Sequence, residues 1–141
     1  MSFFTDLARV LSHNRHLKIN ATKTAVLVNM PVTSTRRQTV KITAHRVRGA
    51  KAEVTAARVV SRAGFLEGHQ LVRKSLEFNA GKQRVSLILS GDSDPPALDA
   101  MLCIPIDVYD EEVYKKIWRV MGEVASVADN LERQLTGDDE L

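Results

Sequence analysis

The segment QTVKITAHRV, residues 38–47, carries the clearest structural pattern in the chain. Val40, Ile42 and Ala44 alternate there with polar residues, and a period of two is typical of a strand that buries one side only. Half-buried strands of this kind belong mainly to antiparallel sheets, which can leave one face open to water. The segment therefore predicts an antiparallel sheet.

Strand patterns also occur on both sides of this segment. TAVLVNMP, residues 24–31, is rich in β-branched residues and predicts a strand that Pro31 should end or place at a sheet edge. AEVTAARVVS, residues 52–61, predicts a further strand, although its alanines would also suit a helix, and Gly64 is expected to break the chain after it. RVSLILS and LDAMLCIPI flank the turn GDSDPP and predict a hairpin over residues 84–106.

Three segments have the spacing of apolar residues that is expected of helices. A short amphipathic helix is predicted over residues 2–12, followed by a polar loop that holds at most a brief extended piece. A second helix is predicted over residues 66–78, with Gly81 placed to cap its end. The third and longest is predicted over residues 110–135, with Asp110 as its N-cap.

The long C-terminal helix should carry one apolar stripe, made of Val113, Ile117, Val120, Val124, Val127 and Leu131. Either this stripe packs on the sheet of its own chain, which we favour, or part of it pairs with a second copy as a coiled-coil-like interface. Gly122 is expected to permit the close approach of another backbone.

These elements follow one another in the order α-β-β-β-α-β-β-α. Runs of strands broken by one helix predict an α+β fold with a mostly antiparallel sheet of about five strands and a long C-terminal helix. With 141 residues, the chain should form a single domain over residues 1–136, followed by a frayed acidic tail at 137–141.

The two parts of the chain carry opposite charge. Residues 1–90 contain 16 Lys and Arg against 4 Asp and Glu, whereas residues 91–141 contain 4 against 13. We interpret this change as the passage from basic sheet edges to an acidic helix that ends one compact domain. A detached acidic region is disfavoured, because the apolar stripe of the helix must be buried.

No pattern of catalytic or metal-binding residues emerges. Cys103 lies in an apolar run and is expected to be a buried, inert thiol in a reducing cytosol. His13 and His16 have a ligand-like spacing but no third ligand nearby. The sequence has no export signal and no run of the ~20 apolar residues that a membrane helix needs. We therefore predict a cytoplasmic protein that is not an enzyme, with no cofactor, metal or membrane partner.

A basic run is the first candidate for binding a partner: Arg36, Arg37, Lys41, Arg46, Arg48 and Lys51. Such a run could meet an acidic protein surface or neutralise phosphates, or it could be a solvated sheet edge protected by its charge. No aromatic residue is interleaved with it, so nucleic-acid binding would rest on phosphate contacts and would be weak.

An aromatic pair is the second candidate. Tyr114 and Trp118 lie one helical turn apart beside the apolar stripe. Together they could anchor a partner, or simply widen the buried face of the helix.

The succession of segments resembles the type III secretion chaperone-like fold, and especially the YbjN-like bacterial proteins. The similar segments are AVLVNMPV and VKITAHRV as early strands, VVSRAG before a helix ending in LEFNAG, RVSLIL, AMLCIPIDVYDEEVYKKI, and the closing helix VASVADNLERQL. The resemblance implies a small, dimeric, non-enzymatic domain that binds other proteins. We accordingly expect a bacterial homodimer that binds a protein segment or an acidic protein surface, chaperone-like or regulatory. The alternative is a basic nucleic-acid-binding domain.

Overall fold

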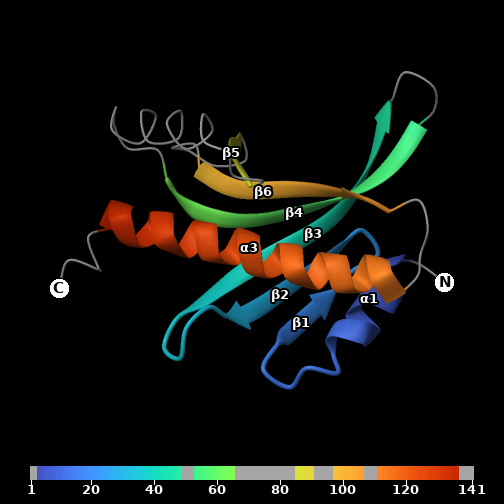
Figure 1. Cartoon of the computed structure of the whole chain (residues 1–141), viewed down its shortest axis with the longest axis horizontal. Helices are drawn as coiled ribbons and strands as arrows, with labels where there is room; N and C mark the ends of the chain where they lie inside the picture. The colour runs from blue at the N-terminus through green and yellow to red at the C-terminus, as the bar shows by residue number, and fades with distance from the viewer. Residues whose placement is uncertain (1–2, 49–52, 66–84, 91–96, 107–110, 137–141) are drawn as a thin grey trace.

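The computed structural model of the chain describes residues 3–48, 53–65, 85–90, 97–106 and 111–136 (Figure 1). Within these residues the fold is α+β, as predicted: a six-stranded antiparallel sheet with a short N-terminal helix, α1 (Phe3–Leu11), and a long C-terminal helix, α3 (Glu111–Thr136). The predicted second helix, the turn GDSDPP, the N-cap Asp110 and the tail at 137–141 lie outside the described residues.

The sheet has the strand order β1-β2-β3-β4-β6-β5, and each neighbouring pair is antiparallel. Its strands are β1 (Lys18–Ala21), β2 (Ala25–Pro31), β3 (Arg37–Arg48), β4 (Glu53–Phe65), β5 (Ser86–Ser90) and β6 (Ala97–Pro105). The predicted hairpin of β5 and β6 is confirmed as an adjacent pair, and Pro31 is the last residue of β2.

The sixth strand, β1, lies in the segment for which the sequence predicted a polar loop with at most a brief extended piece. It is a four-residue edge strand in which only Ile19 is partly buried against the core, so it is too short to produce a clear alternating pattern. Backbone pairing with β2, from Lys18 opposite Asn29 to Ala21 opposite Val26, holds it in the sheet. A sequence pattern based on burial cannot detect a strand of this kind.

The expectation that Gly64 breaks the chain is wrong. Strand β4 continues to Phe65, and its register against β6 shifts between Arg62 and Gly64. A glycine in a strand often marks such an irregularity, because it tolerates backbone conformations that other residues avoid. The same segment is a strand throughout, so its alanines do not make it a helix.

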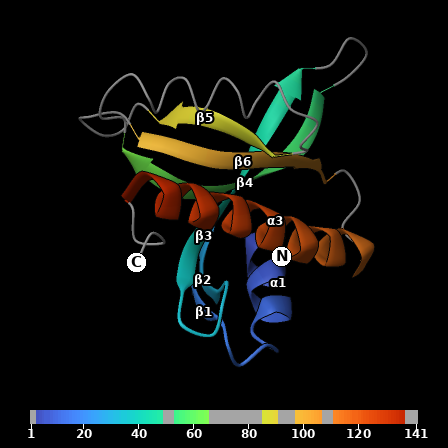
Figure 2. The same cartoon turned by 60° about the vertical axis from the view of Figure 1, so that its left-hand side comes forward.

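Both helices cover one face of the sheet (Figures 1 and 2). Leu7 of α1 and Ile117 of α3 share a hydrophobic core with Val28, Ile42 and Val59 of the strands. The central residues of the predicted stripe on α3, from Ile117 to Val124, are fully buried in this core. The stripe therefore packs on the sheet of its own chain, as we favoured.

Three further expectations are wrong: two concern single residues, Gly122 and Cys103, and one concerns the charge of α3. No atom of the described chain outside α3 itself lies within 4 Å of the position that a Cβ on Gly122 would take, so no other backbone approaches it closely. Cys103 is exposed rather than buried, because it lies opposite Arg58 on the sheet face away from the helices. Helix α3 is not acidic: it holds five acidic and four basic residues, so the acidic excess lies elsewhere in the sequence.

None of the described helices combines the length and the apolar composition that crossing a membrane requires. Among the described residues, no group of three or more His, Cys, Asp or Glu side chains is placed to hold a metal ion.

Candidate functional site

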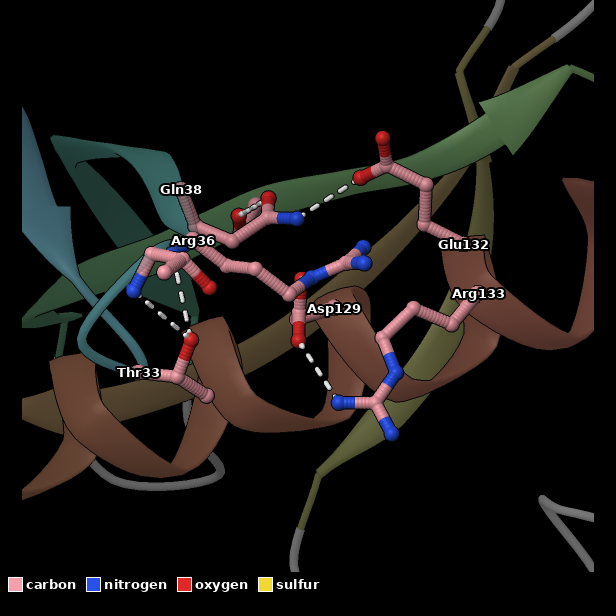
Figure 3. Close-up of polar contacts among 8 residues, drawn as sticks. Thr33, Arg36, Gln38, Asp129, Glu132 and Arg133 are labelled. Atoms are coloured by element: carbon pink, nitrogen blue, oxygen red, sulfur yellow. Dashed lines mark hydrogen bonds and ion pairs between the residues drawn. The ribbon is translucent and has the colours of Figure 1, made fainter. Parts of the chain in front are cut away.

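The first residue of the basic run, Arg36, is paired with a buried carboxylate of the same chain. It follows the β2–β3 turn, and its Nε donates a hydrogen bond of 2.9 Å to Oδ1 of Asp129 on α3 (Figure 3). The Asp129 side chain is only 3% exposed, and Arg133 supplies a second cation 3.6 Å from its other oxygen. The backbone N–H of Arg36 is in turn held at 3.1 Å by the hydroxyl of Thr33.

A second contact beside it fixes the same part of α3 to the sheet. The Gln38 amide at the start of β3 donates a 2.7 Å hydrogen bond to the carboxylate of Glu132 (Figure 3). The Ser61 hydroxyl of β4 lies 3.0 Å from the amide oxygen of Gln38. Burying a polar group is costly unless it is hydrogen-bonded. The side chains of Gln38, Ser61 and Glu132 meet that requirement through these contacts.

The next residue, Arg37, is also committed to internal contacts. Its guanidinium donates to the backbone carbonyl oxygens of His16, at 2.7 Å, and Asn29, at 3.0 Å. It also contacts the side-chain oxygen of Asn29. Arg37 therefore holds the segment that follows α1 against β2.

The other basic residues are spread along a long strand. Lys41 is exposed, on the sheet face away from the helices. Arg46 and Arg48 occupy backbone positions opposite Thr55 and Glu53, where β3 and β4 extend as a two-stranded ribbon past the other strands (Figure 1). Lys51 lies outside the described residues.

The structure does not bring the basic run together on one surface. At ~3.4 Å per residue, the twelve positions of β3 separate its two ends by roughly 37 Å. Neighbouring side chains of a strand also point to opposite faces of the sheet. It stays a prediction that the dispersed members of the run bind a partner. These members are Lys41, Arg46, Arg48 and Lys51.

The aromatic pair, in contrast, lies in a concave site. Tyr114 and Trp118 line a groove of about 1040 Å³ between the N-terminal half of α3 and the end of α1 with the segment that follows it. Tyr114 packs partly on the core. Trp118 is 38% exposed and Val10 of α1 is 40% exposed, and these two are the exposed large hydrophobic side chains of the described chain.

The position of Trp118 follows from helix geometry. It comes directly after the buried Ile117 and so lies about 100° further around the helix, at the margin of the stripe that packs on the sheet. Helix α1, which covers β1 and β2, lies beside this margin and leaves Val10 facing the same groove. An exposed tryptophan in a concave site is a typical anchor for a partner.

Apart from the apolar Leu11, the remaining walls of the groove are polar and basic. They are formed by Leu11 and Asn14 together with His13, Arg15, His16, Lys115 and Arg119. None of the described residues that line the groove is acidic. Lys115 contacts Glu112 at 3.7 Å, but both side chains are largely exposed, and such pairs contribute little. The groove therefore favours an anionic ligand that also has an apolar or aromatic group.

Sequence reasoning identified two of the groove residues and missed the others. In the sequence, the spacing of His13 and His16 indicates only a possible pair of metal ligands, and Val10 indicates only one side of an amphipathic helix. A weak signal is present, because four residues of the stretch 10–19 are basic or imidazole side chains. It could not be interpreted without knowing that this stretch meets the start of α3.

Comparisons with family models, with curated proteins and with solved structures found no match to this chain. The resemblance to the type III secretion chaperone-like fold therefore stays a prediction.

Proposed function

We propose that this protein is a non-enzymatic binding domain that holds an acidic segment of another protein in the groove between α1 and α3. The observation that carries the proposal is the exposed Trp118 in a groove whose charged lining residues are all basic. An apolar side chain of the segment would rest against Trp118 and Val10, while its carboxylates would meet Arg15, Lys115 and Arg119.

The two parts of this recognition act differently. Burial of an aromatic anchor supplies most of the affinity at a typical interface, often about 2 kcal/mol or more for one residue. Rim charges mainly accelerate association and select the sign of the partner, and their effect weakens as salt is added. We therefore expect binding that depends on salt but does not disappear when the charges are screened.

The resemblance extends the proposal. It favours a chaperone-like or regulatory role in the bacterial cytoplasm, with the domain acting as a homodimer. Two features of α3 could have supported a dimer, and neither does. The apolar stripe is buried within its own chain, and no atom outside α3 in the described chain closely approaches Gly122. The homodimer consequently rests on the resemblance alone.

Nucleic acid is the second candidate ligand. The basic run lacks aromatic residues, but the groove places Trp118 and Tyr114 beside Arg15 and Arg119. This combination is suited to stacking a base and neutralising a phosphate. An acidic protein segment remains our first choice, because the basic residues that the structure describes on β3 are spread along the strand and do not form a continuous track for a nucleic-acid backbone.

Trp118 is the only tryptophan of the chain, so its fluorescence reports directly on the groove. The test is a titration with an acidic peptide that carries one Leu or Phe, with the same peptide bearing Asn and Gln in place of Asp and Glu, and with a single-stranded oligonucleotide. We expect saturable changes with the acidic peptide and roughly tenfold weaker binding of its amide version.

The matched variants are Arg119→Glu and Lys116→Glu. Both residues are exposed on α3, but only Arg119 lines the groove. Arg119→Glu should weaken binding of the acidic peptide, while Lys116→Glu should bind it like the parent. Equal binding of the acidic and amide peptides, or tighter binding of the oligonucleotide, would contradict the proposal.

A further inference from the structure

The groove and the acidic end of the sequence lie at opposite ends of α3. Groove residues occur between Tyr114 and Arg119, and the helix ends at Thr136. Since a helix rises ~1.5 Å per residue, Trp118 and Thr136 are separated by roughly 27 Å along the helix axis. Figures 1 and 2 show α1, which forms the other wall, beside the first part of α3 and away from its C-terminal end.

Asp138, Asp139 and Glu140 follow one residue after the last helical residue, Thr136. A fully extended chain spans at most ~3.6 Å per residue, so Glu140 lies no more than about 14 Å from Thr136. This reach is about half of the distance to Trp118. The three acidic residues therefore cannot enter the groove of their own copy, whatever conformation they adopt.

The chemistry of this acidic segment nevertheless matches the groove. Its sequence, DDEL, places three carboxylates before one leucine. The groove offers cationic side chains around an apolar floor made by Val10 and Trp118. In addition, carboxylates at the C-terminus of a helix face the negative end of its dipole, which is unfavourable for them. The nearby cations Arg36 and Arg133 are already paired with Asp129.

We propose that residues 138–141 of one copy bind in the groove between α1 and α3 of a second copy. This inference rests on the proposed function, because it assigns an occupant to the same groove. The two surfaces in contact are different, so reciprocal exchange between two copies closes a two-fold dimer, whereas one-way exchange continues to a ring or a chain. The acidic segment of a second copy would also compete with other partners and so limit their access at high protein concentration.

Self-association can be measured on the full chain by light scattering across micromolar concentrations, together with the emission of Trp118. For the parent we expect a mass that rises with concentration above the 15.7 kDa of one chain, with a blue shift of Trp118 emission. The variant Asp138→Asn/Asp139→Asn/Glu140→Gln keeps the groove and loses the charges. Its self-association should be weaker by roughly tenfold or more.

A mixing experiment separates this arrangement from association through any other surface. Arg119→Glu impairs the groove but leaves the acidic segment intact, whereas the triple amide variant has an intact groove. Each alone should stay near the monomer mass. Mixed together they should form a complex of one copy of each, and the complex should not grow further, because only one productive groove and one productive segment are present. Lys116→Glu is the control and should associate like the parent.

The outcomes distinguish this inference from the proposed function. A parent that stays monomeric, or a triple amide variant that associates as strongly as the parent, overturns the inference. If the acidic peptide still binds at Trp118 in that case, the proposed function stands without it. If neither the peptide nor a second copy changes Trp118 emission, both are overturned.

Discussion

The two halves of α3 carry charge in different ways. In the C-terminal half, Asp129 is buried and paired with Arg36 and Arg133, and Glu132 accepts a hydrogen bond from Gln38. In the N-terminal half, Lys115 and Arg119 line an open groove together with Trp118, and no acidic residue of the described chain lines it with them. In the C-terminal half the carboxylates of Asp129 and Glu132 have partners within the chain, and in the N-terminal half the charged side chains that line the groove are all basic.

The difference shows how one helix can serve both stability and recognition. A buried carboxylate must be paired because the interior solvates it poorly. An exposed cation is solvated by water and needs no partner, so it is available to a ligand at little cost to the fold. If this division is correct, substitutions in the C-terminal half should change stability, and substitutions in the groove should change binding.

The largest effect is expected where the stripe is most deeply buried. Ile117→Asp would place a carboxylate at a fully buried position within the hydrophobic core. Such a change costs about 3–5 kcal/mol, a large part of the ~5–15 kcal/mol that stabilises a domain. Thermal melts should show a much lower midpoint or an unfolded chain.

Lys116→Asp is the control for this variant. Lys116 is exposed on the adjacent position of the helix, so the change should cost no more than about 1 kcal/mol. If Ile117→Asp melted like the parent, the packing of α3 on the sheet would be wrong, and with it both halves of the comparison.

An intermediate loss of stability is expected in the C-terminal half of α3, where Asp129 is paired with Arg36. Arg36→Met keeps much of the side-chain bulk but leaves the Asp129 carboxylate with Arg133 alone, at 3.6 Å. We expect a loss of about 1–3 kcal/mol in the free energy of unfolding, measured by denaturant titration. Arg36 is 27% exposed, which reduces its own desolvation but not that of Asp129.

Arg9→Met provides the comparison for a surface pair. Arg9 contacts Asp6 at 2.7 Å, but its side chain is 62% exposed, so the expected loss is only about 0–1 kcal/mol. Equal losses for Arg36→Met and Arg9→Met would show that the Arg36–Asp129 contact contributes no more than an ordinary surface pair.

The smallest effect on stability is expected in the groove. Trp118→Ala should change the free energy of unfolding by about 1 kcal/mol or less, because the side chain is partly exposed and lies at the margin of the core. Its binding of the acidic peptide, measured by calorimetry, should fall by roughly 30-fold. Trp118→Phe keeps an aromatic anchor and should retain most of the affinity. A large loss of stability with unchanged binding would reverse the assignment of the two halves.

The sequence determined the features that depend on local periodicity. The alternation around Val40 and Ile42 predicted an antiparallel strand, and the apolar stripe through Ile117 predicted a long helix packed on the sheet. Such patterns persist because each element must bury one side, whatever its neighbours are. Where a strand is too short to show the alternation clearly, as in β1, the patterns indicated no more than a brief extended piece, and where β4 continues through Gly64 they were wrong.

Only the tertiary structure decided which charges are used internally and which face a groove. Arg36 and Asp129 lie 93 positions apart in the chain, and the walls of the groove come from the two ends of the sequence. In the sequence, Arg36 and Lys41 are members of the same basic run. In the fold, one is paired beside α3 and the other is exposed on the opposite face of the sheet. The role of a charged residue depends on what the fold brings within a few ångströms of it, because charge–charge interactions weaken with distance and with exposure to water.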